Sequence, residues 1–460
     1  MPEERTGLRL LAAALAAALM PLNSTMIAVA LPDIATEFDT DAVVVTQALV
    51  TSYLVAAIVL QSPGGKLGDR IGHGRMLVIG QVLVGAGALL GYVGSALGLL
   101  TVARVLMAAG GAVLLPVTVA LMRHALPPHR RGRAFGAFGA LMGLAAAVGP
   151  LVGGGLVDAF GWRSVFVANL PVLAVSLTLG AAAGSVPVTV RWPRPRFDWV
   201  GSLLLAAALS SVVIGLRPGG GQTLVLLVAG VVLLVPFVVW EQRAADPVVA
   251  FSLFRSTTFS AGSLLIAAQN LVMYSLLFEI PVIAEELLDL HARGTGLILV
   301  SLMLAMVIVS PIAGRLVDHV GARSVAVAGS LAALAGIVVL ARVEVTSAVQ
   351  VVIPLALLGI GLGLTTPAAQ SASTTAAPVE HTGMAAGVTS TMRYLGGLVG
   401  VAVMSMLLDV GGTRAALVSE HRSLMAVFVA ALLVGLVCAA LLPGRVRVTD
   451  ETVGDVPAPL

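Results

Sequence analysis

The chain has 460 residues, of which 58% are hydrophobic and only 11% are charged, and its formal net charge is +3. Soluble domains average about 25% charged residues, so this composition excludes a water-soluble protein of this size. The single cysteine, Cys438, excludes an internal disulfide and a zinc site built on several cysteines, and no phosphate-binding loop of an ATP-driven protein is present.

Apolar runs separated by short polar breaks follow one another along the whole chain. A helix needs about 20 apolar residues to cross the hydrocarbon core of a bilayer, and most of the runs reach that length. Runs such as 224–239 are apolar on every side, whereas barrel strands would alternate, so helices are predicted. The predicted spans are 8–30, 46–65, 75–96, 98–122, 133–157, 163–184, 199–216, 221–240, 258–284, 295–314, 323–341, 348–371, 383–408 and 422–442.

The distribution of basic residues predicts the orientation. Fourteen spans leave both termini on one side, and placing them in the cytoplasm puts 18 of the 26 lysine and arginine residues there and 6 outside. Cytoplasmic loops of membrane proteins carry such an excess. The preference for arginine over lysine points to a GC-rich bacterial genome. We therefore expect a multi-pass protein of the bacterial inner membrane with cytoplasmic termini.

One short loop sequence occurs twice, between two predicted helices each time. The matched residues, at a constant offset of 249, are Gly65 with Gly314, Asp69 with Asp318, and Gly72 with Gly321. Glycines allow helix ends to approach closely, and Asp69 could pair with Arg70, with Arg75 or with a helix N-terminus across an interface. Two such copies predict two halves of parallel topology whose contacts break and re-form as a gate.

The offset between the copies spans eight predicted helices, two more than a six-plus-six arrangement needs. A segment rich in proline and arginine, 187–198, precedes the extra pair. The predicted parts are an N-terminal six-helix bundle, a linker with two extra helices, a C-terminal six-helix bundle and a cytoplasmic tail. Their residues are 1–186, 187–257, 258–442 and 443–460.

Two motifs carry a family resemblance. Residues 64–75, GGKLGDRIGHGR, resemble the loop motif of the major facilitator superfamily. The helix around Gly149-Pro150-Leu-Val-Gly153-Gly154 resembles the antiporter motif of its drug-exporting branches, in which glycines allow close packing and the proline bends the helix. Further matches from Leu22 to Gly444 are similar to the fourteen-helix drug:proton antiporter family.

This resemblance implies an all-α polytopic membrane protein with the major facilitator fold: two six-helix bundles plus two inserted helices. It implies a secondary active transporter, not an enzyme, that exports small amphipathic compounds such as drugs and antibiotics by proton antiport with alternating access. We expect small-molecule substrates, protons and the lipid bilayer as partners, no nucleic acid, no metal or cofactor, and a monomer.

The first helix departs from the family pattern. The family acid is replaced by Asn23, which cannot titrate. Buried charges are costly in lipid, so Arg104, Glu279 and Arg393 are functional candidates. Glu279 is the first choice as replacement proton carrier, or else an interfacial acid; Arg104 could stabilise a carboxylate or donate to backbone carbonyls. The predicted proton and substrate pathway comprises Asn23, Thr25, Gln47, Tyr53, Arg104, Gln269, Asn270, Glu279 and Arg393.

All seven histidines are predicted in loops or at helix ends, which argues against a histidine relay inside the membrane. Two alternatives to the exporter stay open. The first, motivated by Asn23, is a uniporter or uptake carrier of a small metabolite; proton exchange on substrate addition would separate it from an antiporter. The second is a non-transporting membrane receptor or scaffold, which would show no substrate flux.

Overall fold

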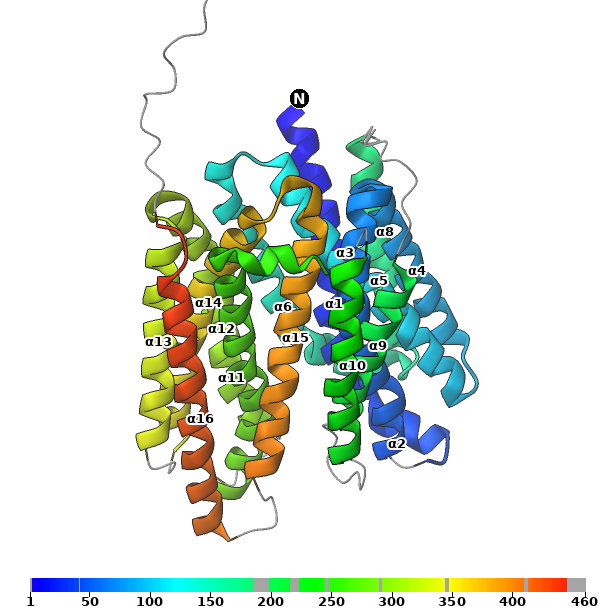
Figure 1. The fold of residues 1–460 in the computed structure, drawn as a ribbon. Helices are drawn as coiled ribbons and strands as arrows, with labels where there is room; N and C mark the ends of the chain where they lie inside the picture. Colours follow the sequence, from blue (N-terminus) through cyan, green and yellow to red (C-terminus); the bar gives the residue numbers. More distant parts are fainter. Residues whose placement is uncertain are drawn as a thin grey trace, which may run out of the picture.

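The computed structural model describes residues 2–40, 42–184, 198–215, 223–244, 247, 249–288, 292–343, 347–408 and 413–444. The described residues are almost entirely helical, without a strand, and the long helices run side by side (Figure 1). In chain order the elements are α1 (Pro2–Glu37), α2 (Ala42–Thr46), the π-helical η1 (Gln47–Thr51), α3 (Ser52–Ile71), α4 (His73–Val93), α5 (Leu97–Ala125), α6 (Pro128–Phe160), α7 (Ser164–Val167), α8 (Asn169–Ala182), α9 (Trp199–Gly215), α10 (Thr223–Arg243), the 3-10 turn η2 (Phe251–Arg255), α11 (Thr257–Leu288), α12 (Ala292–Val320), α13 (Ala322–Arg342), α14 (Ala348–Ala376), the 3-10 turn η3 (Val379–His381), α15 (Thr382–Leu407) and α16 (Arg414–Ala440).

Among the described residues, ten helices are long and apolar enough to cross a membrane, and α9 adds a shorter apolar segment. The predicted all-helical, polytopic class is therefore confirmed. Most helices extend beyond the predicted apolar runs, as α1 does with 36 residues. The predicted span 46–65 passes through α2, η1 and α3, and the predicted span 163–184 is divided at Ala168 into α7 and α8.

The helices pack around two large apolar cores. One is built by α1, η1 and α3 to α8, and it includes Met20, Leu49 and Phe166. The other is built by α11 to α16, with Leu302, Leu355 and Phe428. Lipid is as apolar as these side chains, so close packing holds such helices together more than exclusion of water does. The domain boundaries at 186 and 258 stay a prediction.

The predicted extra pair, α9 and α10, lies against α3. Asp198 begins this unit: its Oδ1 accepts from the backbone N–H of Gly201 (2.8 Å) and from Trp240 Nε1 of α10 (2.9 Å). Leu205 and Phe237 then join an apolar cluster with Ile58 of α3. The pair therefore covers α3 beside the helices of the C-terminal half.

Both ends of the described chain lie at one face, at the top of Figure 1, which we call the amino face. Here α1 begins, and Pro443, after α16, accepts a backbone hydrogen bond from Arg323 of α13 (3.1 Å). The other end of the molecule is called the opposite face. Residues 187–197 of the predicted linker and 445–460 of the predicted tail are outside the described residues.

Candidate functional site

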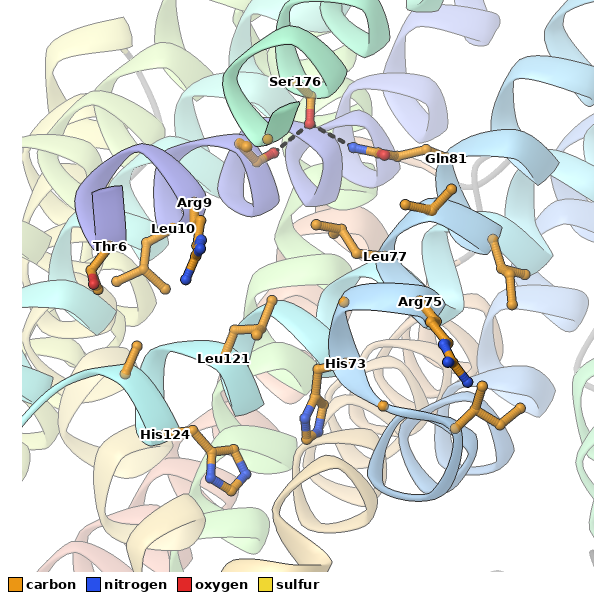
Figure 2. A pocket seen from close by; sticks show the side chains of 18 of the residues that line it. Thr6, Arg9, Leu10, His73, Arg75, Leu77, Gln81, Leu121, His124 and Ser176 are labelled. Atoms are coloured by element: carbon orange, nitrogen blue, oxygen red, sulfur yellow. Dashed lines mark hydrogen bonds between the residues drawn. The ribbon is translucent and has the colours of Figure 1, made fainter. Parts of the chain in front are cut away.

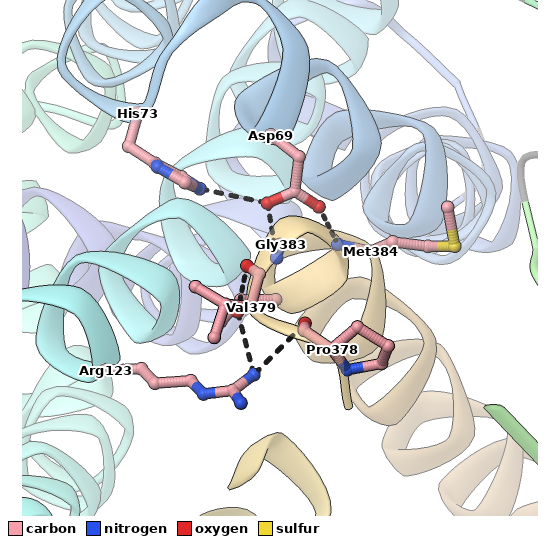
Figure 3. A network of polar contacts seen from close by, with 8 residues as sticks. Asp69, His73, Arg123, Pro378, Val379, Gly383 and Met384 are labelled. Carbon is pink, nitrogen blue, oxygen red and sulfur yellow. Dashed lines mark hydrogen bonds and ion pairs between the residues drawn. The ribbon is translucent and has the colours of Figure 1, made fainter. Parts of the chain in front are cut away.

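At the amino face, Asp69 of the first loop motif caps the start of α15. Its Oδ1 accepts from the backbone N–H of Gly383 (2.7 Å) and its Oδ2 from that of Met384 (2.8 Å), as Figure 3 shows. The first N–H groups of a helix have no acceptor within it, and the helix dipole favours an anion there. Of the partners considered for Asp69, the structure has the helix N-terminus; His73 Nε2 lies 3.1 Å away.

Asp318 of the second loop motif makes the same contact in the other direction. Its Oδ1 accepts from the backbone N–H of Gly132 (2.7 Å) and its Oδ2 from that of Arg133 (2.8 Å), both near the start of α6. Asp69 of the N-terminal half thus caps a helix of the C-terminal half, and Asp318 of the C-terminal half caps a helix of the N-terminal half. Together the two contacts close the amino face between α3 and α15 and between α12 and α6.

The motif glycines allow this geometry. A Cβ on Gly65 would overlap the carbonyl oxygen of Gly383, and a Cβ on Gly314 would overlap that of Gly132. The second glycines end α3 and α12 in the left-handed region, with φ of 102° at Gly72 and 89° at Gly321. Glycine adopts that region without steric cost, so each motif combines a close helix crossing with a sharp turn.

Arg123, at the end of α5, joins the first contact. Its Nη1 donates to Thr382 Oγ1 (2.8 Å) and its Nη2 to the carbonyl oxygen of Ala377 (2.7 Å), between α14 and α15, and Figure 3 shows the arginine reaching the turn at Pro378 and Val379. This role of Arg123 could not be predicted from the sequence, because an arginine at a helix end is common. Of the other predicted gate residues, Arg70 is half-buried and Arg75 is exposed.

The segment after α10 also touches both helices at the gate. Lys66 of α3 donates to the carbonyl oxygen of Pro247, and the backbone N–H of Ala250 lies 3.2 Å from Met384 Sδ of α15. The inserted unit is thus in contact with α3 and α15 where they cross.

The motif in α6 packs against α1. A Cβ on Gly149 would overlap Thr25 Oγ1, and one on Gly153 would lie 2.8 Å from Met26 Cγ. The packing at Gly154 is looser, because a Cβ there would lie 3.8 Å from Val29. Pro150 lies within α6. Thr25 Oγ1 itself donates to the carbonyl oxygen of Pro21 in its own helix (3.1 Å).

Gly149→Ala is expected to lower the free energy of unfolding by about 1–3 kcal/mol, because an added methyl group must displace α1 from α6. Gly155→Ala on the same helix is the matched control, since nothing lies within 4 Å of its Cβ. Thermal unfolding of the detergent-solubilised protein measures both variants. Equal unfolding temperatures for the two would contradict the packing described.

Arg104 of α5 is buried, with 1% of its surface exposed. Its Nε donates to the carbonyl oxygen of Leu49 (2.9 Å), its Nη1 to that of Asn23 (3.3 Å), and its guanidinium lies 4.1 Å from the centre of the Tyr53 ring. Leu49 lies in η1, where the π-helical turn alters the regular hydrogen-bond pattern. Tyr53 in turn donates to the carbonyl oxygen of Met20 (2.9 Å). Arg104 therefore links α1, η1 and α5 through backbone carbonyls.

The remaining predicted pathway residues lie apart from Arg104. Asn270 Nδ2 donates to Ile266 in its own helix (2.8 Å), and neither side-chain amide atom of Gln269 has a partner among the described residues. Arg393 Nη2 donates to Gln370 Oε1 (3.3 Å). Gln47 is exposed at the start of η1.

Two tyrosines of the C-terminal half approach one another near Arg393. The ring centres of Tyr274 on α11 and Tyr394 on α15 are 6.5 Å apart, and Tyr394 packs against the apolar core of the N-terminal half, which contains Tyr53 of α3. Tyr394 is not among the predicted pathway residues; its position directly after Arg393 in a glycine-rich helix was the available signal. This tyrosine–arginine cluster offers aromatic faces and hydroxyl groups between the two halves.

Glu279 meets an unexpected partner. Its Oε1 lies 2.6 Å from Nδ1 of His421 on α16, and the two side chains are 0% and 3% exposed. The prediction that every histidine lies in a loop or at a helix end is therefore wrong for His421. Helix α16 begins at Arg414, well before the predicted span, because the helix continues into a polar sequence that hydropathy excludes.

A separate cavity of about 1430 Å³ lies at the amino face among α1, α4, α5 and α8. Its polar lining includes Arg9, Arg75 and His124, and Gln81 Nε2 donates to Ser176 Oγ (2.6 Å) in its wall (Figure 2). Almost all of the lining comes from the N-terminal half, so this cavity is distinct from the tyrosine–arginine cluster.

The model of the Major Facilitator Superfamily matches residues 13–400, and a second match covers 263–459. The chain belongs to the Major Facilitator Superfamily. As a member of this superfamily it is a multi-pass membrane transporter of small molecules, and it has the all-helical fold of the family.

Named relatives of this superfamily member include two proteins of drug or antibiotic resistance. It is 31% identical over 412 residues to the multidrug resistance protein Stp of Mycobacterium tuberculosis, with 87% of this chain and 75% of the relative covered. It is 30% identical over 407 residues to the tetracenomycin C resistance and export protein of Streptomyces glaucescens, with the same coverage. Among solved structures, the proton:xylose symporter XylE has the same fold, with a TM-score of 0.67 at 14% identity over 94% of this chain and 95% of that chain.

Proposed function

We propose that this chain exports small amphipathic compounds, drugs or antibiotics, by proton antiport and alternating access. In this proposal it is a fourteen-helix drug:proton antiporter in which two six-helix bundles, 1–186 and 258–442, move against each other. The protein acts as a monomer in the bacterial inner membrane, with the amino face in the cytoplasm.

The matched capping contacts carry this proposal. Asp69 caps α15 and Asp318 caps α6, so each half holds a helix of the other at one face. Charge-assisted hydrogen bonds to helix ends are strong but few, so such a face can close firmly and still open. The names of the multidrug resistance and tetracenomycin relatives favour export as the direction.

The tyrosine–arginine cluster is proposed to contact the substrate. Tyr274 and Tyr394 provide aromatic faces, and Tyr394 packs against the core of the N-terminal half, so the cluster lies where the two halves face each other. Aromatic rings with one polar tip suit amphipathic molecules better than sugars, which need many hydrogen-bond partners.

Everted membrane vesicles from a host lacking its own efflux pumps test the proposal. A panel of amphipathic dyes and antibiotics, beginning with ethidium, is added after a proton gradient has been established. We expect uptake of at least one compound into the vesicles, a simultaneous release of protons, and loss of uptake when the gradient is collapsed. Transport of a compound without any exchange of protons would contradict the proposal.

Asn23 favours a second candidate, a uniporter or uptake carrier of a small metabolite. An asparagine cannot exchange a proton, and its backbone carbonyl already accepts from Arg104 (3.3 Å). A uniporter would equilibrate its substrate across the vesicle membrane in either direction and would not respond to the proton gradient. The same vesicle experiment separates the two candidates.

A further inference from the structure

A carboxyl–imidazole pair lies inside the C-terminal half, between α11 and α16. Glu279 Oε1 and His421 Nδ1 are 2.6 Å apart, a distance that requires a hydrogen between them. The two residues are 142 positions apart in the chain and come from adjacent helices. The pair therefore results from the packing of the two helices and not from a local turn.

The surroundings of the pair are apolar. Leu417 and Leu424 lie one turn before and after His421 on α16, and Ile280 and Ile283 follow Glu279 on α11; all four are buried. The second oxygen, Glu279 Oε2, and the second nitrogen, His421 Nε2, have no hydrogen-bond partner among the described residues. One shared hydrogen is thus the only polar contact that either side chain makes in this part of the structure.

We propose that the Glu279–His421 pair is the site at which this transporter binds and releases its coupling proton. With the proton the pair is neutral overall, whether as acid and imidazole or as carboxylate and imidazolium. Without the proton, a carboxylate remains beside a neutral imidazole, and a net charge among apolar side chains is costly. Release of the proton therefore favours a conformation in which water reaches the pair. This inference rests on the proposed proton antiport.

No other ionisable group described on α11, α16, α13 or α14 takes the place of His421 beside Glu279. Glu286 on α11, Arg422 on α16 and Arg342 at the end of α13 are exposed. Glu420 of α16 is half-buried and has an interaction of its own. Arg414 of α16 donates to the carbonyl oxygen of Leu287 (2.8 Å). The sequence of α14 contains no ionisable side chain.

The ionisable groups of the two other neighbouring helices belong to different contacts. On α12, Asp318 and His319 lie at the amino face, where Asp318 caps α6, and Arg315 is exposed. On α15, Arg393 and Tyr394 belong to the tyrosine–arginine cluster.

The pair is separate from the proposed substrate cluster but shares a helix with it. Tyr274, five residues before Glu279 on α11, points to α15, where a Cβ on Gly397 would lie 2.6 Å from its ring. Glu279 points to α16 instead. Proton and substrate would thus act on two sides of α11, so the coupling passes through the position of this helix and needs no direct contact between them.

Labelling of the wild-type protein tests the pair without any substrate. Dicyclohexylcarbodiimide reacts with protonated carboxyl groups in apolar surroundings, and mass spectrometry locates the modified residue. We expect Glu279 to be labelled in a reaction that declines as the pH rises, and His421→Gln to move the midpoint of that decline by at least one pH unit. Absence of labelling at Glu279 at every pH, or an unchanged midpoint in the variant, would overturn the proposal.

Transport of ethidium separates this proposal from the proposed function. Glu279→Gln should retain exchange of ethidium across vesicles at equal concentrations but reduce accumulation driven by a proton gradient at least tenfold. Glu286→Gln, on the same helix and exposed, is the matched control and should accumulate ethidium normally. Proton-driven accumulation by Glu279→Gln at the wild-type level would contradict the assignment of the coupling proton to the Glu279–His421 pair, but it would agree with proton antiport. Transport of ethidium by the wild-type protein without any exchange of protons would contradict both the proton site and the proposed antiport.

Discussion

Replacing both capping aspartates, Asp69→Asn together with Asp318→Asn, is expected to abolish export while the protein still inserts and folds. Each carboxylate accepts two backbone hydrogen bonds from a helix of the other half. An asparagine can accept one of these bonds, but its NH₂ group then faces the second N–H. Hydrogen bonds to charged groups contribute about 1.5–3 kcal/mol each, so each substitution should cost the closed amino face about 2 kcal/mol.

A loss of about 2 kcal/mol changes a conformational equilibrium about 30-fold. We therefore expect each single variant to export at roughly a tenth of the wild-type rate or less, and the double variant to be inactive. Initial rates of substrate uptake into everted vesicles measure the effect. Asp158→Asn is the control, because this aspartate of α6 is exposed at the opposite face. Wild-type rates in the double variant would show that the caps do not control the cycle.

The second large effect is expected for Gly65→Ala and its counterpart Gly314→Ala. The added Cβ would overlap the carbonyl oxygen of Gly383 in the first case and of Gly132 in the second. Backbone cannot yield as a flexible side chain does, so α3 must move away from α15, or α12 from α6. Overpacking of this kind costs about 1–3 kcal/mol, and here the cost applies only when the amino face is closed.

Both glycine variants should therefore reach the membrane in normal amounts and have less than about a tenth of the export activity, because they stay open at the amino face. Gly98→Ala on α5 is the control, since nothing lies within 4 Å of its Cβ. Substrate flux and protein amount in the same vesicles give the specific activity. Full activity of Gly65→Ala would mean that α3 and α15 do not need to meet during transport.

Much of the helical architecture follows from hydropathy alone, because a bilayer permits few alternatives to a helix. The repeated motif also indicated that Asp69 and Asp318 share an environment. Their partners were beyond sequence reasoning, since the N–H groups of Gly383 and Met384 are backbone groups more than 300 residues from Asp69. Every residue except proline carries a backbone N–H group. The side chains of Gly383 and Met384 therefore do not indicate that their N–H groups bind Asp69.

The error at His421 has a similar physical origin. Hydropathy marks where a helix enters apolar surroundings, but α16 continues beyond that point through Glu420 to Arg414. A prediction from hydropathy therefore assigns buried polar residues near a helix end to loops. It does not reveal the side chains with which they form hydrogen bonds, such as Glu279 for His421. A helical projection from 414 onward would have placed His421 on the same face as Leu417, Leu424 and Phe428, which are buried.

The central claim, that the amino face closes and opens while the two halves stay intact, is tested most directly by a distance across that face. Spin labels at Ile71→Cys at the end of α3 and Val379→Cys in η3 are suitable, because both positions are exposed and flank the Asp69 cap. The single native cysteine, Cys438, is removed as Cys438→Ala. We predict two distances whose populations change with pH and substrate, and a fully populated long distance in the double aspartate variant. A single short distance under all of these conditions would contradict the account.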